Sequence, residues 1–381
     1  MSIWKIPLFD SDIGEAEIEA ATRVMRSKWL TMGDVTRQFE ERFCEQLGVR
    51  NALAVSNGTT ALHLANVVLG LGPGDEVIVP SLTFVATVNS ILYTGATPVF
   101  ADVSGPNDLN ISPADIEKKI TSRTKAIMVV HYAGYPCDMP RIMEIARRHN
   151  LYVIEDAAHA PGASIAGQSV GMFGDCGCFS FFSNKNMATG EGGMLVTRRD
   201  DLAARIKLLR SHGMTSLTLD RYKGHSFSYD VVALGYNYRV TEICSAIGLV
   251  QLEKLTANNQ RRAELVAYYR SALAEVSDIT VPFEQHVGTS AFHILPILLP
   301  PGADRQAFMN FLKEQGIQTS IHYPPVHRFT FHRQFVRSGD ELPQTESLAL
   351  REVTLPLYPA LTEQQIDYIA ATVRQFFGQR G

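Results

Sequence analysis

One lysine of the sequence follows an apolar run that is typical of a buried strand. Residues 176–182 are Cys-Gly-Cys-Phe-Ser-Phe-Phe, and the short polar segment after them carries Lys185. A glycine-rich stretch, residues 189–193, then leads into another apolar run. A lysine held partly out of water has a lowered pKa, so its amine can attack a carbonyl and form a Schiff base. The alternative is a surface lysine whose ammonium group stays in water.

Two carboxylates end another apolar run. Residues 151–154 (Leu-Tyr-Val-Ile) lead directly into Glu155 and Asp156, and His159 follows three residues later. Because side chains alternate along a strand, only one of the two acids is expected to face a ligand at the edge of the sheet. That carboxylate could bind a ribose, a metal ion or a ring nitrogen. The alternatives are a solvated loop acid and a structural histidine.

Two further segments carry residues that could bind anions. Residues 56–61 (Ser-Asn-Gly-Thr-Thr-Ala) follow a strand and open a helix, so Gly58, the hydroxyl of Thr59 and free backbone N–H groups could hold a phosphate. A plain helix N-cap is the alternative.

Residues 234–242 place Asn237 and Arg239 beside two tyrosines ahead of a long helix, which is typical of anion recognition. Thr241 as an N-cap is compatible with that role.

The four clusters together indicate one chemistry. An amine that forms a Schiff base, a carboxylate that pairs with a pyridinium nitrogen and a helix N-terminus that holds a phosphate are the parts needed to bind pyridoxal 5′-phosphate (PLP). The combination is more specific than any single cluster.

The elements that would position these residues alternate between short apolar runs and helical patterns. Several runs are rich in Val and Ile without alternation, which is typical of strands covered on both faces. The pattern predicts an α/β fold with a mostly parallel, seven-stranded sheet. The predicted strands are residues 52–56, 76–80, 98–103, 126–131, 151–156, 176–182 and 193–197. The predicted helices between them are residues 59–69, 87–93, 113–119 and 140–149.

The pattern changes in the second half of the chain. The predicted elements there are helices at residues 241–277, 304–315 and 361–377 and strands at residues 292–299 and 318–322. Thr362 with Gln365 three residues later is expected to cap the last helix. We therefore predict a large α/β domain over residues 1–254 and a smaller C-terminal α+β domain over residues 255–381.

Composition argues against several classes of protein. The 381 residues include 35 Lys and Arg against 39 Asp and Glu, and this slightly acidic balance disfavours a broad nucleic-acid surface. No run of eighteen apolar residues and no apolar signal core is present, so we expect a cytoplasmic protein without a membrane span. The five scattered cysteines are a poor disulfide framework. Cys176 and Cys178 lack a second Cys/His pair at zinc spacing, so we expect no metal site.

Five segments, in their order and spacing, resemble one known family. They are SNGTTALHLA, PSLTFVAT, VIEDAAHA, FSFFSNKN with the following TGEGG, and GYNYRVTEI. They are similar to segments of the DegT/DnrJ/EryC1/StrS sugar aminotransferases, and the resemblance covers the chain from about Pro7 to the C-terminal helix. It implies the fold type I architecture of aspartate aminotransferase, PLP as cofactor, and a homodimer whose two active sites lie at the shared interface.

Position by position, the resemblance implies roles at the cofactor. Lys185 matches the Schiff-base lysine, and Asp156 matches the acid that faces the pyridine nitrogen. The other implied cofactor contacts are His159 near the 3′-hydroxyl, Phe84 stacked on the ring, Gly58, Thr59 and Ser180 at the phosphate, and Asn237 of the partner subunit, also at the phosphate.

The resemblance also implies a substrate end. The expected contacts are Arg239 with an anionic group, Thr31 and Gly33 in the segment WLTMGDVT, and His322, Tyr323 and His327 in the segment IHYPPVH. The polar segment at residues 216–230, with Arg221, Lys223 and His225, is expected to be a functional or interface loop that contributes to the choice of sugar.

The implied reaction moves an amino group from L-glutamate to a nucleoside-diphosphate keto-sugar. Relatives with histidine in place of the lysine are sugar 3-dehydratases that use pyridoxamine phosphate, so Lys185 favours transamination. The other functions considered are an aminotransferase for a cyclitol ketone or another carbonyl, a non-enzymatic PLP-fold sensor, and a nicotinamide oxidoreductase. The last would need G-x-G-x-x-G after an early strand, and the glycine-rich residues 69–74 precede a strand instead.

Overall fold

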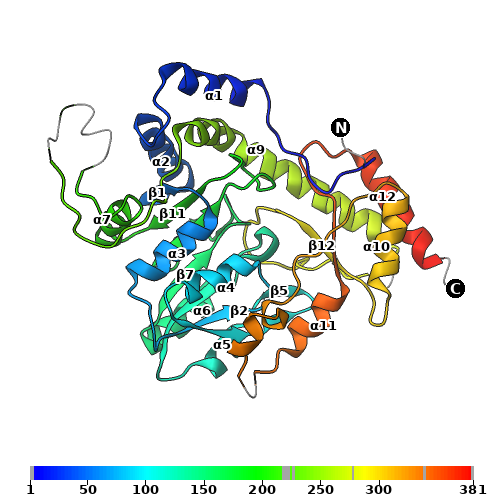
Figure 1. The fold of residues 1–381 in the computed structure, drawn as a ribbon. Helices are drawn as coiled ribbons and strands as arrows, with labels where there is room; N and C mark the ends of the chain where they lie inside the picture. Colours follow the sequence, from blue (N-terminus) through cyan, green and yellow to red (C-terminus); the bar gives the residue numbers. More distant parts are fainter. Residues whose placement is uncertain (1–3, 217–223, 225–227, 277–278, 338–339, 379–381) are drawn as a thin grey trace.

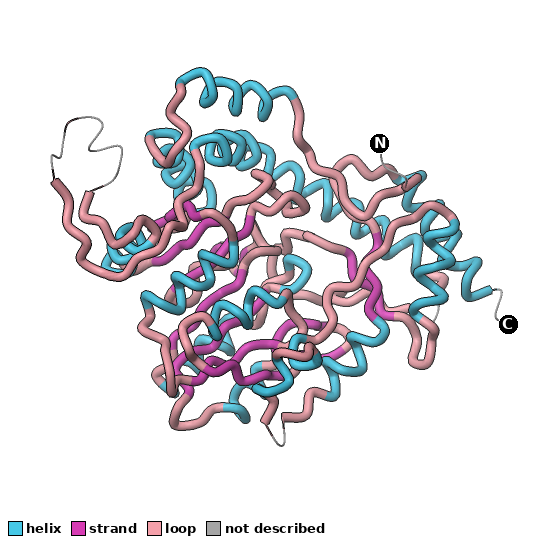
Figure 2. The backbone as a smooth tube through the Cα atoms, viewed as in Figure 1, coloured by secondary structure: helices cyan, strands magenta, loops and turns pink. Residues whose placement is uncertain are grey.

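The molecule has a large α/β part and a smaller part that packs against it. The computed structural model describes residues 4–216, 224, 228–276, 279–337 and 340–378. Helices α10 (Arg305–Glu314) and α12 (Glu363–Gly378) and strand β12 (Leu295–Leu298) belong to the smaller part, on the side of the molecule where both termini lie (Figure 1). Figure 2 shows the strands of the large sheet running through the α/β part with helices around them.

The large sheet has seven strands in the order β1-β11-β10-β7-β6-β2-β3. Their bounds are β1 (Asn51–Val55), β2 (Glu76–Pro80), β3 (Thr97–Ala101), β6 (Thr124–Val130), β7 (Tyr152–Asp156), β10 (Cys176–Ser180) and β11 (Gly193–Thr197). Neighbouring strands are parallel except at β11, which pairs antiparallel with both β1 and β10. The predicted mostly parallel seven-stranded sheet is confirmed.

Helices bury both faces of this sheet. One apolar core joins the strands to α3 (Gly58–Val68), α4 (Val85–Leu92) and α7 (Asp200–Leu209). A second core joins the other face to α5 (Pro113–Lys119) and α6 (Met139–His149). Because β7 and β10 are adjacent and parallel, the residues that follow them meet at the same edge of the sheet.

The smaller part contains a two-stranded antiparallel sheet of β12 and β13 (Glu352–Leu355). The predicted strand at residues 318–322 is wrong, because only Ser320 forms a bridge, to Thr354. The reason is local: the backbone N–H of His322 donates to the carboxylate of Glu352 instead of to a neighbouring strand. Thr362 and Gln365 do cap α12, as predicted.

A single long helix, α9 (Glu242–Leu273), crosses the predicted domain boundary at residues 254 and 255. It contacts α1 (Glu15–Ser27), α2 (Asp34–Leu47) and also α12 in the smaller part. The side chain of Thr241 accepts a hydrogen bond from the backbone N–H of Cys244, so the predicted N-cap is confirmed. The boundary itself stays a prediction.

Several elements are absent from the sequence patterns described above. They are α1, α2, α7, α11 (Pro343–Arg351), β13, and the short pairs β4 (Val103–Gly105) with β5 (Asp108–Ile111) and β8 (Ser164–Ile165) with β9 (Gln168–Ser169). Helix α1 buries only Glu17, Ala20 and Val24, so its apolar stripe is narrow. These three residues recur at helical spacing, so the sequence carries a signal for this helix that the predicted elements omit.

Some expectations concern segments that are only partly described. Residues 217–223 and 225–227 of the expected loop at 216–230, with Arg221, Lys223 and His225, lie outside the described residues. Every helix in the described ranges is too short or too polar to cross a bilayer. Within those ranges no group of three His, Cys, Asp or Glu side chains could hold a metal ion, and all five cysteines are free.

One buried carboxylate holds the start of α2. The side chain of Glu242 accepts hydrogen bonds from the backbone N–H groups of Gly33, Val35 and Thr36 and from the hydroxyl of Thr36. These amides have no partner within α2 because they lie in its first turn. Glu242 is the first residue of α9, so this contact fixes α2, and Thr31 before it, against the long helix.

We predict that Glu242→Ala destabilises the protein. The substitution leaves three amides of the α2 start without their acceptor, which should lower the free energy of unfolding by about 3 kcal/mol. Urea unfolding followed by circular dichroism measures the change. The control is Glu253→Ala, an exposed residue of the same helix, with an expected effect below about 0.5 kcal/mol. Equal midpoints for the two variants would contradict the anchoring role of Glu242.

Candidate active site

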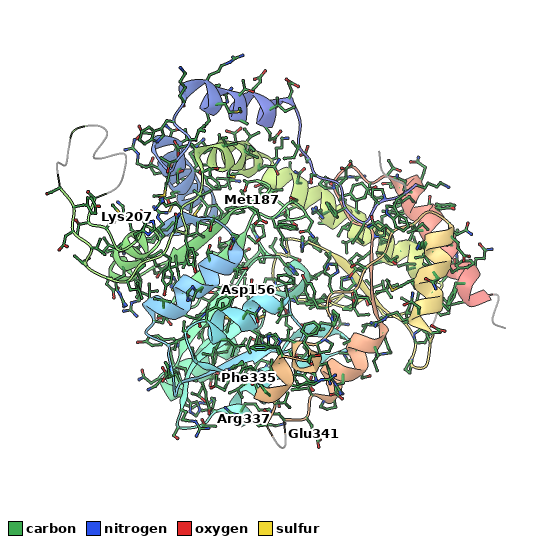
Figure 3. The ribbon with its side chains drawn as sticks, in the orientation of Figure 1. Asp156, Met187, Lys207, Phe335, Arg337 and Glu341 are labelled. Atoms are coloured by element: carbon green, nitrogen blue, oxygen red, sulfur yellow. The ribbon has the colours of Figure 1, made fainter. Side chains whose placement is uncertain are left out.

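A cavity of about 360 Å³ opens at the edge of the sheet where β7 and β10 end. Asp156 at the end of β7 lies near the middle of the molecule, beside α4 (Figure 3). The lining residues come from six segments far apart in the chain. They include Gly58, Thr59, Phe84, Asp156, His159, Ser180, Lys185, Glu191, His322 and Tyr323.

Lys185 lies in the turn after β10, and its backbone N–H donates to the carbonyl of Phe182. The residue is partly buried, and this burial lowers the pKa of its amine to about 8, while the charge of Asp156 opposes the shift. An amine with this pKa is part neutral at physiological pH and is therefore available as a nucleophile or base.

The two acids at the end of β7 face opposite sides, as the alternation predicted. Asp156 lines the cavity. Glu155 is buried on the other side, where it accepts hydrogen bonds from the backbone N–H groups of Gly171, Phe173 and Gly174. The carboxylate that faces the cavity is therefore Asp156, and Glu155 holds the loop before β10.

Asp156 is kept as a hydrogen-bond acceptor although it is buried. Its Oδ2 accepts from the hydroxyl of Thr87 at 2.8 Å, and its Oδ1 accepts from the backbone N–H of Ala158 at 3.1 Å. Burial raises the pKa of this carboxyl, whereas Thr87, Ala158 and the charge of Lys185 lower it. A cationic ring nitrogen in the cavity would lower it further, which favours the ionised form.

His159 is buried between the cavity and the smaller part. Its Nε2 lies 2.9 Å from the hydroxyl of Tyr323, and its Nδ1 is buried without a partner among the described residues. Burial holds the pKa of this histidine well below its usual range, with the charge of Lys185 acting in the same direction. A buried nitrogen without a partner is costly, so it indicates a polar ligand atom next to the ring.

The backbone at the start of α3 lies close to strand β10 and borders the cavity. Asn57 caps the helix through the backbone N–H of Thr60, and both Gly58 and Thr59 line the cavity. A Cβ on Gly58 would lie 2.9 Å from the Cβ of Ser180, so only glycine lets β10 pass this close. The predicted N-cap is present, and the position also suits a phosphate because the first N–H groups of a helix attract anions.

Phe84 forms part of the cavity wall. Its side chain is 56% exposed, and the centre of its ring lies 5.9 Å from that of Tyr323. A large exposed aromatic side chain at the rim of a cavity suits stacking against a flat ligand. An amine, a buried carboxylate, a histidine nitrogen without a partner, an aromatic wall and a helix start thus converge on one cavity, and this set fits PLP.

Only two of the expected substrate residues line the cavity. His322 and Tyr323 line the cavity. Thr31 forms a bridge with Thr241, and Arg239 donates to the hydroxyl of Ser211, both away from the described lining. His327 is buried, and its Nδ1 lies 2.6 Å from the hydroxyl of Ser81 and its Nε2 3.2 Å from Glu346.

Asn237 also lies outside this lining, although the prediction places it at the phosphate of the partner subunit's cofactor. Its backbone pairs with Ser211, and the residue is exposed. Its expected role requires an exposed position, so the placement is compatible with that prediction. The residues not predicted from the sequence are Thr87, within the segment PSLTFVAT, Asn186, within FSFFSNKN, and His293.

The chain is similar to known proteins along most of its length. The sequence model of the DegT/DnrJ/EryC1/StrS aminotransferase family matches residues 11–374. GDP-perosamine synthase of Caulobacter vibrioides is 42% identical over 355 residues, which cover 92% of each chain. Spore coat polysaccharide biosynthesis protein SpsC of Bacillus subtilis is 39% identical over 368 residues, 95% of this chain and 94% of SpsC. The PLP form of the putative sugar aminotransferase Spr1654 of Streptococcus pneumoniae superposes with a TM-score of 0.91 at 30% identity, covering 98% of this chain and 99% of that one.

We predict that Thr87→Val weakens PLP binding about tenfold, because the ionised carboxylate of Asp156 loses a hydrogen bond. The loss raises the pKa of Asp156 further, so the weakening should grow as the pH falls. Equilibrium dialysis of PLP between pH 6 and 8 measures it. Thr83→Val is the comparison variant. Thr83 also lines the cavity, but its hydroxyl lies 2.8 Å from that of Thr87 and does not contact Asp156, so its removal should change affinity less than about threefold. Equal effects of the two variants would refute the role of Thr87.

Proposed function

The chain belongs to the DegT/DnrJ/EryC1/StrS aminotransferase family and is a PLP-dependent aminotransferase, and we propose on this premise that it transfers an amino group from L-glutamate to a keto-sugar nucleotide. The product is an amino-sugar nucleotide. The observation that carries the proposal is the single cavity in which the amine of Lys185, the carboxylate of Asp156 and the ring of His159 meet.

The residues of the cavity divide the binding of the cofactor among them. When bound, PLP supplies an aldehyde that captures amines and a pyridinium ring that withdraws electrons. Lys185 would hold the aldehyde carbon, and Asp156 the ring nitrogen. Phe84 would cover one face of the ring, and His159 would contact its 3′-hydroxyl through the nitrogen that has no protein partner. Gly58, Thr59 and Ser180 would hold the phosphate.

Lys185 would also move the proton that transamination requires. Its free amine would take a proton from one of the two carbons that flank the transferred nitrogen and return a proton to the other, as general base and then acid. A pKa of about 8 allows both roles near neutral pH. Asp156 stays ionised beside the ring nitrogen, because two hydrogen bonds to protein donors stabilise its negative charge.

The substrate end would be formed by the segment at residues 321–327 and by residues outside the described cavity lining. Tyr323 and His322 reach the cavity from this segment and would contact the sugar. Arg239, Thr31 and His327 are proposed around them as further substrate contacts. Asn237 would complete the phosphate site of the partner subunit's cofactor, which requires a homodimer with shared active sites.

The relatives support a sugar nucleotide as the acceptor. One is named GDP-perosamine synthase, and another is named for spore coat polysaccharide biosynthesis. Both match this chain along nearly its whole length.

We predict that Lys185 carries the cofactor and that Lys185→Ala lowers turnover by about a thousandfold or more, since it removes both the carbonyl-binding amine and the proton carrier. Borohydride reduction of the PLP-loaded protein, followed by peptide mass spectrometry, should place a pyridoxyl group on Lys185. Lys207, on the neighbouring helix α7, serves as the control and should remain unlabelled. A wild-type protein with no adduct on Lys185 would overturn the assignment.

We predict that the PLP-loaded protein reacts with L-glutamate alone, and that the aminated enzyme then returns to its starting spectrum when a keto-sugar nucleotide is added. Absorbance spectroscopy follows both half-reactions separately. A keto-cyclitol without a nucleotide is the comparison acceptor, and free GDP, UDP and dTDP should compete only against a sugar nucleotide. Turnover of the cyclitol with no effect of any nucleotide would replace the proposed acceptor but leave the aminotransferase intact.

A further inference from the structure

A histidine that the mechanism above does not use lies next to Lys185. His293, just before β12, is buried, and its Nε2 lies 3.5 Å from the Nζ of Lys185. Its ring also packs on that of His159, with 4.4 Å between the ring centres. His293 is 108 residues from Lys185 in the sequence, so only the packing of the smaller part on the sheet brings them together.

The amide of Asn186 has only one possible orientation. One atom of this amide lies 2.6 Å from the carbonyl oxygen of Ala291, and a carbonyl can only accept, so that atom must be the nitrogen. The same nitrogen donates to Asn259, whose own amide nitrogen donates to the carbonyl of Pro161. The amide oxygen of Asn186 therefore faces Nδ1 of His293, at 2.9 Å.

This orientation decides the tautomer of His293. An amide oxygen accepts only, so Nδ1 of His293 must carry a hydrogen. Burial and the neighbouring charges of Lys185 and Arg262 hold the pKa of His293 well below its usual range, so the ring is neutral. Nε2 then has a free lone pair, and this lone pair faces Lys185.

We propose that His293 is a positioning residue that accepts a hydrogen bond from the Lys185 amine through Nε2, with its tautomer set by Asn186. The proposal rests on the proposed role of Lys185 as the Schiff-base and proton-transfer residue. A lysine side chain has many rotamers, so a released amine without an acceptor would not stay oriented toward the reacting carbons. Arg262 donates to the backbone carbonyl of His293 and keeps the acceptor itself in place.

Other titratable groups around the amine enter any measurement of its pKa. Asp156, His159, His322, Tyr323 and Glu191 line the same cavity. Asp156 favours the charged amine, whereas burial lowers the pKa of His322 to about 4 and that of His159 well below its usual range, so both rings are neutral near pH 7. These groups are the same in all variants below, so differences between variants report on His293.

Two substitutions separate the two nitrogens of the ring. His293→Gln can place an oxygen near the position of Nε2 and can still accept from Lys185. His293→Asn can keep a donor near the position of Nδ1, facing Asn186, but is too short to reach Lys185. The reactivity of Lys185 toward an acylating reagent, followed against pH in the PLP-free protein by peptide mass spectrometry, measures the pKa of the amine in each.

The expected result differs between the two variants. In His293→Asn the ammonium form loses an acceptor, so the pKa of Lys185 should fall by about one unit and labelling at pH 7 should become about fivefold faster. In His293→Gln both should stay near the wild-type values. With PLP bound, His293→Asn should lower kcat about tenfold with little change in the KM for L-glutamate. Unchanged Lys185 reactivity in His293→Asn, or equal changes in both variants, would overturn the proposal and leave His293 a packing residue.

The wild-type protein provides a test without any folding risk. Nitrogen NMR of protein labelled with ¹⁵N-histidine should show His293 neutral with its hydrogen on Nδ1, and the spectrum of His293→Asn identifies the signal. A hydrogen on Nε2 would overturn the proposal. Because neither measurement needs bound cofactor, failure of the wild-type protein to form a pyridoxyl adduct on Lys185 would count against the proposed function, separately from the contact with His293.

Discussion

The site depends on keeping an amine and a carboxylate out of bulk water within one cavity. Burial opposes the charge on both groups, lowering the pKa of Lys185 and raising that of Asp156. The protein offsets this cost at Asp156 with two donors, the hydroxyl of Thr87 and the backbone N–H of Ala158. Lys185 and Asp156 lie close together because β7 and β10 are adjacent and parallel and therefore end at the same edge of the sheet. Burial that is offset by hydrogen bonds in this way shifts the pKa values of side chains toward the range that acid–base chemistry near neutral pH requires.

Helix α9 connects this cavity to both parts of the molecule. Its polar side chains face inward along the turn that carries Lys185: Gln251 accepts from the backbone N–H of Ala188, and Asn259 accepts from Asn186. One turn further, Arg262 donates to backbone carbonyls of the smaller part, at His293 and Leu357. The same helix thus supports the lysine from the α/β part and the histidine from the smaller part. These contacts explain why a 32-residue helix carries buried polar residues at its centre.

The sequence predicted the seven-stranded sheet because its strands are continuous apolar runs, and it predicted the helices between them because their apolar faces repeat clearly. It failed where side chains replace backbone pairing, as at residues 318–322, where Glu352 accepts the N–H of His322. The helices α1 and α2 also have no counterpart in the predicted elements. The start of α2 is held by the distant carboxylate of Glu242, and such a contact has no local pattern.

For the site, the sequence by itself determined the chemical groups. Local periodicity placed Lys185 after a buried strand and required that only one of the two acids face a ligand. The resemblance to the family selected Asp156, and the structure places it in one cavity with Lys185. Only the tertiary structure decided how these groups are supported. The hydroxyl of Thr87 on Asp156, the Nε2 of His293 beside Lys185 and the enclosure of His327 by Ser81 and Glu346 join residues separated by 19 to 246 positions. Hydrogen bonds between such residues depend on how distant elements pack, and no spacing along the chain encodes that packing.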